Sequence, residues 1–310
     1  MNKSRLGRSF SDLIEIQGLL GDRRRLNPLP AYEKSPQIAK KIGITSGKGG
    51  TGKSILACNL SVYLSTMGKK VTILDADFGL ANDHLLFGLY PDLNISHLLS
   101  GCVKAEDIKV RCSEGVWLIP GTSGIEWMAD LSDISIYKVA QSLEGMERIS
   151  DFMLIDTSAG ISRHTLLLLL SCDEIIVVTN ANATAITDAY AISKIIFQLK
   201  PTARIWIAVN RVKDDRESAA VFQKMNDVCQ KFLKKQFLYL GCLQENELVN
   251  HSVNLKIPFF IKHPFSTASG EVARMGQTIS ANGGSSNVGF ASEFIHVRIR
   301  KIIQGENMRT

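Results

Sequence analysis

The sequence predicts an α/β fold, a doubly wound and mostly parallel sheet with helices on both faces. Seven short apolar segments of strand character alternate with helical segments along most of the chain. The predicted strands lie at residues 41–45, 70–74, 116–119, 152–155, 174–179, 204–209 and 237–243, and the clearest helical periodicity covers residues 53–67, 184–199 and 217–235. The strands are continuously apolar, which is typical of parallel strands buried on both faces. The alternation of strands with helices favours parallel pairing.

The composition is that of a globular protein with a large core. With 310 residues, of which 45% are hydrophobic, the chain has room for one large α/β domain and terminal extensions. Its longest aliphatic run, residues 166–170, is too short to span a bilayer, and Asp12 and Glu15 interrupt the one candidate signal-peptide core. The six cysteines are scattered without a C-x-x-C pair. This spacing favours reduced thiols and a cytoplasmic location.

Composition divides the chain into three parts. We expect a basic extension at residues 1–40, the α/β domain at residues 41–280, and a flexible linker with an amphipathic helix at residues 281–310. The formal charge is +6, and residues 1–41 hold nine Lys or Arg against four acids, so +5 lies there. A basic arm attracts anionic lipid, nucleic acid or an acidic partner, and the sequence leaves these open. It equally leaves open a solvated tail or a short partner-binding helix at residues 12–20.

The C-terminal segment has the pattern of an interfacial helix. Four isoleucines, at positions 295, 299, 302 and 303, fall on one helical stripe, while Arg298, Arg300 and Lys301 supply positive charge. A basic amphipathic helix on a flexible tether is typical of a reversible membrane anchor. We therefore expect residues 290–303 to contact membrane lipid. Docking of this helix on the core, or pairing with a second copy, are the alternatives.

A phosphate-binding loop pattern follows the first predicted strand. Residues 47–54 read G-x-x-x-x-G-K-S, and a helical stretch follows that stops at Gly68. The glycines let consecutive backbone N–H groups converge on an anion, and the helix N-terminus adds its positive end. We expect Lys53 to reach the β- and γ-phosphates and the Ser54 hydroxyl to ligate Mg²⁺. The loop residues expected to bind nucleotide are Gly47, Lys48, Gly49, Gly50, Thr51, Gly52, Lys53, Ser54 and Ile55.

Acidic residues end two further predicted strands. Asp75 and Asp77 follow the strand at residues 70–74, and Asp156 closes the strand at residues 152–155. The carboxyl ends of parallel strands form the ligand-binding edge of such sheets, so we expect these acids beside the phosphate loop. An acid that closes an apolar strand is typical of a Walker B strand, where it holds the metal through its water shell. Ser54 and Asp156 are therefore the metal-binding residues that these two patterns predict.

These motifs together resemble the MinD/ParA group of deviant Walker A ATPases. The loop reads K-G-G-T-G-K-S from Lys48, the second strand is followed by D-A-D-F-G-L-A-N, and Asp156 opens D-T-S-A-G. The resemblance implies a P-loop NTPase fold with ATP or ADP and Mg²⁺ as ligands. It implies that Lys48 crosses a dimer interface to the partner's nucleotide, so that ATP produces a homodimer. It implies that Asp75 supports the Mg²⁺ and its water shell, which adds Asp75 to Ser54 and Asp156 as a predicted metal-binding residue. It also implies that Asp77 activates the attacking water, which makes Lys48, Lys53 and Asp77 the predicted catalytic residues.

The same resemblance extends to base recognition and to the segment after Asp156, which is called switch II in this group. Asn210 and Arg211 end the predicted strand at residues 204–209, at the position where the group reads the adenine. In the group, the backbone of switch II, which lies near Gly160 here, senses the γ-phosphate. Gln244 stands in a segment where relatives usually have proline followed by an acid, so the base contact there is left open.

Within this group the chain resembles the FlhG (FleN) branch, regulators of flagellar number and placement. The segments that carry this resemblance are residues 75–88, 94–101, 119–125 and 156–160. It implies a slowly hydrolysing ATP switch that is cytoplasmic and reversibly membrane-associated, with the flagellar GTPase FlhF and basal-body or regulatory proteins as partners. The sequence departs from the usual pattern of this branch in three features. His84 replaces an aspartate that is shifted to Asp83, Thr51 replaces a valine, and the usual D-Q-A-x-x-L-R helix is not recognisable in residues 1–40.

Other functions remain open at this point. A ParA-type DNA-partitioning ATPase would use a basic surface to bind DNA without sequence preference. A MinD-type regulator of the division site and a nucleotide-bound scaffold with negligible hydrolysis are the remaining alternatives.

Overall fold

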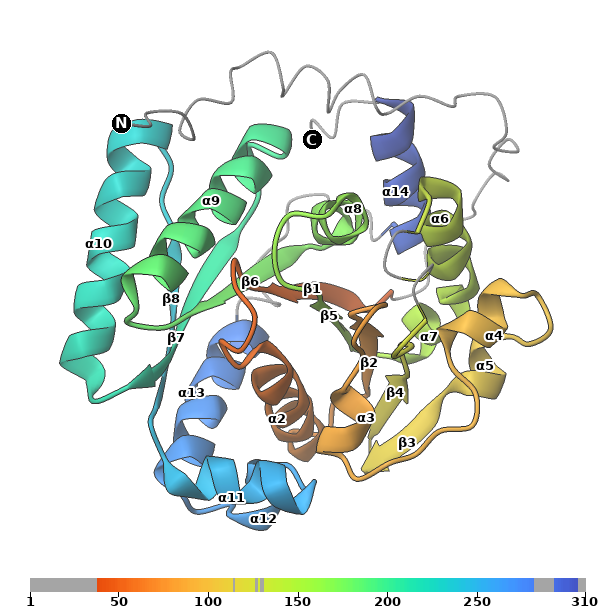
Figure 1. The fold of residues 1–310 in the computed structure, drawn as a ribbon, viewed down its shortest axis with the longest axis horizontal. Helices are drawn as coiled ribbons and strands as arrows, with labels where there is room; N and C mark the ends of the chain where they lie inside the picture. Colours follow the sequence, from red (N-terminus) through yellow and green to blue (C-terminus); the bar gives the residue numbers. More distant parts are fainter. Residues whose placement is uncertain (1–37, 114, 126–127, 129–130, 282–292, 306–310) are drawn as a thin grey trace, which may run out of the picture.

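A parallel sheet forms the centre of the molecule. The computed structural model describes residues 38–113, 115–125, 128, 131–281 and 293–305. Eight strands lie in the order β3-β4-β2-β5-β1-β6-β7-β8, and within this sheet β3 is the antiparallel member (Figure 1). The strands are β1 Lys40–Thr45, β2 Val71–Ala76, β3 Val110–Ser113, β4 Val116–Ile119, β5 Phe152–Thr157, β6 Glu174–Thr179, β7 Ile205–Val212 and β8 Leu238–Gln244.

Helices cover both faces of this sheet, so the predicted doubly wound architecture is confirmed (Figure 1). One face carries α2 (Lys53–Thr66), α11 (Glu247–Leu255), α12 (Phe259–Lys262) and α13 (Thr267–Ala281). The other carries α6 (Asp133–Ser142), α8 (Arg163–Ser171), α9 (Ala183–Leu199), α10 (Asp215–Leu233) and α14 (Ile295–Gln304). The remaining short helices are α3 Asp83–Leu86, α4 Ile95–Leu99, α5 Ala105–Ile108 and α7 Glu144–Ile149. Apolar residues of the buried strands enter clusters on both faces; β2, for example, contributes Leu74 and Ala76 to one cluster and Val71 to another.

The strand predictions differ from the structure mainly at the carboxyl ends. The segments at residues 116–119 and 174–179 are correct to the residue, whereas β2, β5 and β7 run two or three residues further than expected. The polar residues that end each apolar run are still paired in the sheet, since Asp75 lies opposite Asp156 and Asn210 opposite Leu243. The antiparallel strand β3 was missed because it is short and half exposed, so it lacks an apolar run.

Helix α14 lies on the core, which is the alternative arrangement that the sequence analysis left open beside lipid contact through residues 290–303. Ile295 and Ile299 are fully buried, and Ile303 is 6% exposed, in the cluster that also holds α6 and α8. The amphipathic stripe is present, but it faces protein. The residues preceding α14, from 282 to 292, are outside the described part of the chain, as are residues 1–37 with their basic arm.

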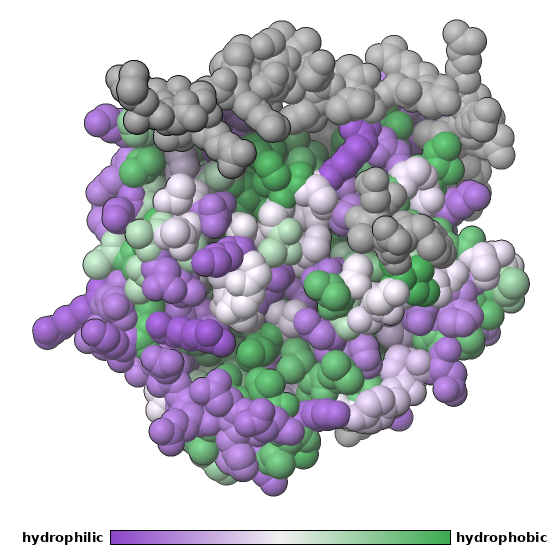
Figure 2. Space-filling view, in the orientation of Figure 1, coloured by the Kyte–Doolittle hydropathy of each residue, from purple (hydrophilic) through white to green (hydrophobic). Residues whose placement is uncertain are grey.

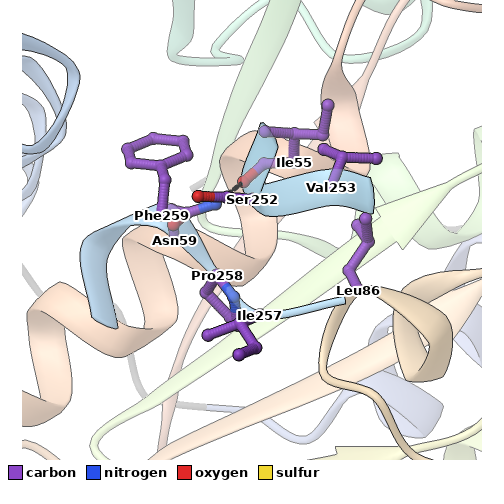
Figure 3. A pocket seen from close by; sticks show the side chains of 8 residues that line it. All are labelled: Ile55, Asn59, Leu86, Ser252, Val253, Ile257, Pro258 and Phe259. Carbon is purple, nitrogen blue, oxygen red and sulfur yellow. Dashed lines mark hydrogen bonds between the residues drawn. The ribbon is translucent and has the colours of Figure 1, made fainter. Parts of the chain in front are cut away.

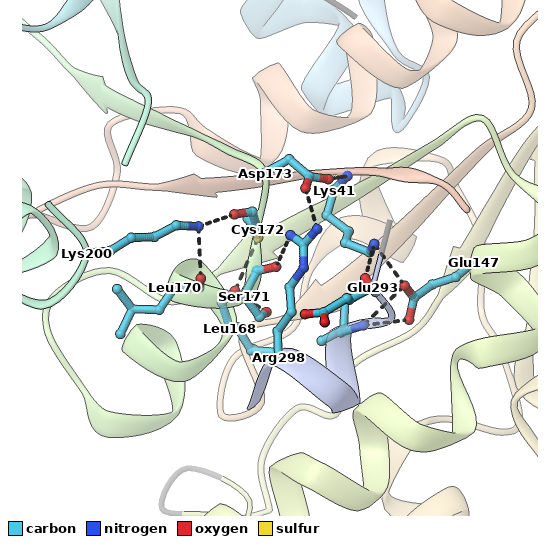
Figure 4. A network of polar contacts seen from close by, with 11 residues as sticks. Lys41, Glu147, Leu168, Leu170, Ser171, Cys172, Asp173, Lys200, Glu293 and Arg298 are labelled. Carbon is cyan, nitrogen blue, oxygen red and sulfur yellow. Dashed lines mark hydrogen bonds and ion pairs between the residues drawn. The ribbon is translucent and has the colours of Figure 1, made fainter. Parts of the chain in front are cut away.

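Buried ion pairs hold α14 to the sheet (Figure 4). The Lys41 ammonium lies 3.3 Å from a Glu147 oxygen, and both side chains are completely buried. Glu147 also accepts hydrogen bonds from the Ile295 backbone N–H, at the N-terminus of α14 where a negative charge is favourable. Arg298 pairs with Asp173 at 2.7 Å and donates to the Ser171 carbonyl. This network joins the strand before the phosphate loop to the C-terminal helix.

Among the described helices there is none that is long and apolar enough to cross a bilayer.

Candidate nucleotide and metal site

The phosphate loop lies where the sequence places it, between β1 and α2 and at the carboxyl edge of the sheet. Two of its glycines are required by close contacts. A Cβ on Gly47 would lie 2.1 Å from the backbone of Asp188 on α9, and a Cβ on Gly52 would lie 2.1 Å from the Asn210 side-chain nitrogen. Gly52 also has φ of 96°, which L side chains rarely adopt. Gly49 meets no atom within 4 Å, so its surroundings are open.

Replacing Gly52 by alanine is expected to distort the loop even without nucleotide. The added Cβ collides with Asn210 and the backbone is strained, at a cost of about 2 kcal/mol, or a fall in Tm of about 6 °C. Gly49→Ala is the matched control, because a Cβ there meets nothing. Thermal unfolding of the nucleotide-free proteins measures both. Equal Tm values for the two variants would contradict the predicted contact.

The two lysines of the loop lie in different environments. Lys53 opens α2 and is 8% exposed, whereas Lys48 is exposed at the tip of the loop. The Ser46 hydroxyl donates a hydrogen bond to the Lys48 carbonyl at 2.7 Å, which fixes the backbone beneath that side chain. The structure thus buries Lys53 within its own subunit and exposes Lys48. The Lys48 ammonium is free to reach outward.

A serine and two carboxylates meet beneath the loop. Ser54 Oγ donates to Asp156 Oδ2 at 2.5 Å, and Asp156 pairs with Asp75 across neighbouring strands. Asp156 Oδ1 is buried and has no hydrogen-bond partner among the described residues. These hard oxygen donors fit Mg²⁺, which binds through few carboxylates and keeps water and phosphate oxygens as its other ligands. Among the described residues, no group of three or more His, Cys, Asp or Glu side chains is arranged to hold a metal ion.

The buried carboxyls are difficult to ionise without a cation. Burial raises the pKa of Asp75 to about 7, and the nearby Asp156 charge adds to this effect. Burial raises the pKa of Asp156 to about 6, while the Lys53 ammonium and the Ser54 hydroxyl oppose the shift. A divalent cation at this place would relieve the repulsion between the two acids. The charge pattern therefore favours a site for Mg²⁺.

Asp83 is a third buried acid that the sequence analysis did not place in the site. Its side chain is completely buried and lies within hydrogen-bonding reach of the Asp156 carboxyl. Burial raises its pKa well above the usual range, and the charges of Asp75 and Asp156 add to the shift. The one available signal was its position eight residues after Asp75, and the shift of this acid relative to the FlhG pattern obscured it. Its neighbour His84 is only partly buried.

Asp75 and Asp77 also shape the segment that follows β2. One Asp75 oxygen accepts hydrogen bonds from the backbone N–H groups of Asn82 and Asp83, both at 3.0 Å. Asp77 is half-buried and accepts a 3.3 Å bond from the Leu80 N–H. Asp75 thus holds the segment in place, and Asp77 lies in the turn at the sheet edge. The segment after Asp156 also contacts the phosphate loop, since the Gly160 N–H donates a hydrogen bond to the Ser46 carbonyl at 3.0 Å.

Asn210 contacts the loop itself. Its amide nitrogen donates to the Thr51 carbonyl at 2.7 Å, and its oxygen accepts from the Arg211 N–H at 2.8 Å. Arg211 is exposed and takes the left-handed conformation, with φ of 54°. The side chain predicted to read the base therefore also braces the phosphate loop, a contact that links residues 159 positions apart in the sequence.

Thr51 and Ile55, two further residues of the loop, pack against the protein. Ile55 lines a small cavity between α2, α3 and the segment after α11 (Figure 3). This cavity, of about 10 Å³, is no larger than one water molecule and holds no organic ligand. The Thr51 hydroxyl is buried and has no hydrogen-bond partner among the described residues. Ile55 can therefore contribute its backbone N–H to a phosphate, but its side chain packs.

A strand, a glycine loop, a helix and paired acids at one sheet edge define a nucleotide-binding P-loop protein. The chain belongs to the CobQ/CobB/MinD/ParA nucleotide-binding family, whose domain model matches residues 42–259. It is similar to the antiactivator FleN of Pseudomonas aeruginosa, with 30% identity over 74% of this chain and 81% of that protein. It is also similar to the flagellum site-determining protein YlxH of Helicobacter pylori, with 36% identity over 69% of this chain and 72% of that protein.

The chain is also similar in fold to solved structures of the same family. The septum site-determining protein MinD of Pyrococcus horikoshii, complexed with Mg-ADP, has a TM-score of 0.68 and 27% identity, and the match covers 80% of this chain and 98% of that one. The predicted fold class and the resemblance to the MinD/ParA group with its flagellar branch are thereby confirmed.

Proposed function

We propose that this protein is an ATP-dependent dimerising switch that hydrolyses ATP slowly and regulates flagellar number or placement. The observation that carries the proposal is the hydrogen bond from the half-buried Ser54 to the buried Asp156, beneath a glycine loop whose Lys48 is exposed. Of the two relatives named above, YlxH is a flagellum site-determining protein, and FleN bears the name of the branch that the sequence resembles; both support the biological output. The Mg-ADP in the related MinD structure supports ADP and Mg²⁺ as ligands here.

The residues would divide the work as follows. The loop N–H groups and Lys53 bind the phosphates of ATP, while Ser54, Asp75 and Asp156 hold the cation and its water shell. Bound Mg²⁺ would neutralise charge that develops on the phosphates. Asp77, at the edge of the site, orients the attacking water, and Lys48 reaches the nucleotide of the partner subunit. Asn210 and Arg211 lie where the base would bind. Positioning and electrostatics do most of the chemistry in phosphoryl transfer, so a slow switch needs no further group.

Membrane association is the finer part of the proposal. In the docked position of α14 the isoleucine stripe is buried, so lipid binding through residues 290–303 requires this helix to leave the core. We propose that ATP-driven dimerisation promotes this release, which makes the protein cytoplasmic with ADP and membrane-associated with ATP. FlhF, basal-body proteins and flagellar regulators are the partner classes that this function suggests.

Turnover of ATP tests the enzymatic claim. Asp77→Ala is expected to lower the rate about a hundredfold, because the water loses its orienting group. Phosphate release is measured with Mg²⁺ and ATP for both proteins, and binding of a fluorescent ATP analogue shows that the variant still holds nucleotide. Equal rates would remove the ATPase claim and leave a nucleotide-bound scaffold.

A further inference from the structure

An apolar patch projects from the surface between α11 and α13. It consists of Leu255, Ile257, Ile261 and Phe265, which are 42%, 37%, 46% and 101% exposed. We call these four residues the α12 patch, after the short helix at its centre. Phe265 is as exposed as a side chain can be. In Figure 2, hydrophobic residues lie between hydrophilic ones along the lower rim of the molecule, where Figure 1 places α11 and α12.

The exposure follows from how the same segment is anchored. Phe259 is 1% exposed and belongs to the core beneath the patch. The Phe260 N–H donates to Asn59 on α2 at 2.9 Å, and its ring packs edge-on against Tyr63, with 5.6 Å between the ring centroids. Figure 3 shows Ile257 and Phe259 pointing in different directions. Because Phe259 and Phe260 already occupy the inner positions, the residues of the α12 patch have no place in the core.

The segment that carries the patch has charge of one sign. Residues 248–270 contain no Asp or Glu, and they include the exposed Lys256 and Lys262 on either side of Ile257 and Ile261. Lys256 donates to the hydroxyl of Tyr90 at 2.5 Å and lies 5.0 Å from the centre of its ring. Tyr90 is itself 70% exposed, so an amphipathic aromatic ring adjoins the cationic group. Apolar side chains flanked by lysines and tyrosine are the composition of protein surfaces that bind the membrane interface.

We propose that the α12 patch is a docking surface for anionic lipid, in which Phe265 and the two isoleucines enter the headgroup layer and the lysines contact lipid phosphates. The patch projects from the surface, and the cavity beside Ile257 has a volume of only about 10 Å³. A fluid lipid surface can adapt to a projecting phenylalanine, and the charges are complementary. The inference rests on the proposed membrane association, but it uses a surface that is already exposed while α14 is docked.

Sedimentation with vesicles tests this surface in the full chain. Without nucleotide, the protein is expected to bind vesicles containing phosphatidylglycerol better than vesicles of phosphatidylcholine alone, and added salt should weaken the binding. Ile261→Ser with Phe265→Ser should lower the partition into the anionic vesicles about tenfold, because both side chains lose their apolar area. Phe232→Ser is the matched control, since this phenylalanine on α10 is 66% exposed outside the patch.

The nucleotide dependence separates this inference from the proposed function. If the double variant binds anionic vesicles as the unchanged protein does, or if neither protein binds without nucleotide, the α12 patch is not a lipid surface. If the patch variant loses its binding without nucleotide but still gains binding on adding ATP, the patch and the release of α14 act separately. If the variant binds vesicles normally but loses a purified flagellar partner, the patch is a protein-binding surface and the lipid proposal is wrong.

Discussion

Replacing Lys48 by alanine is expected to abolish ATP-dependent dimerisation while leaving a monomer that still binds ATP. The Lys48 side chain is exposed at the loop tip, and the hydrogen bond from Ser46 holds its backbone carbonyl and not its ammonium. The loop should therefore keep its conformation in the variant. Lys53, Ser54 and the N-terminus of α2 remain to bind the phosphates of the same subunit. What is lost is the one loop cation free to contact a partner's nucleotide.

Light scattering coupled to gel filtration measures the oligomer with ATP, with ADP and without nucleotide. To prevent turnover during the run, the Lys48→Ala change is compared in the Asp77→Ala background. Lys69→Ala is the matched control, because Lys69 is an exposed lysine beyond the other end of α2. The control should dimerise normally with ATP. Normal dimerisation of the Lys48 variant would show that this lysine does not act across an interface.

Features encoded by neighbouring residues were predictable from the sequence. The continuous apolar runs located most strands, since burial on both faces leaves a local pattern. The phosphate loop and the acids at strand ends converge for a topological reason, because parallel strands bring their carboxyl ends to one edge. Asp75 and Asp156 therefore lie opposite each other although they are 81 positions apart in the sequence (156 − 75).

Features that depend on long-range packing were not predictable. The amphipathic pattern of α14 is the same whether its apolar stripe faces lipid or protein, so periodicity alone could not decide. The decisive contacts join Glu147 to Ile295, and Asp173 to Arg298, across more than a hundred residues. The burial of Asp83 and the bracing of the loop by Asn210 are of the same kind. Each of these features depends on which element of the fold packs against the residue, and a local sequence pattern does not contain that information.

Replacing Lys41 by methionine is expected to destabilise the fold by about 3 kcal/mol, because it leaves a buried carboxylate without its cation. The lost partners are Glu147 at 3.3 Å and the Glu293 carbonyl at 2.6 Å, beside the N-terminus of α14. For a chain of this size we expect Tm to fall by about 9 °C. Because the network joins β1 to α14, backbone hydrogen exchange in α14 should become faster, and more so than in α13 on the opposite face of the sheet.

The pH dependence of stability identifies the charge responsible. Burial raises the pKa of Glu147 to about 7 against the attraction of Lys41, so the folded protein holds this proton more tightly than the unfolded chain. The stability contributed by the protonated group is therefore complete below the unfolded pKa and is lost as the pH rises through about 7. Without Lys41 the pKa of Glu147 rises further. The destabilisation in Lys41→Met should thus be larger at about pH 8 than at about pH 5.

The double variant Lys41→Met with Glu147→Gln separates charge from packing. It removes both charges and keeps a side chain of similar size opposite α14, so it should recover at least half of the lost Tm and remove the added pH dependence. Denaturation of the four proteins of this cycle, at both pH values, measures the coupling between the two residues. If the double variant is no more stable than Lys41→Met, the stability of this junction comes from the packing of the lysine chain and its contact with Glu293. The ion pair would then be a consequence of α14 docking and not its cause.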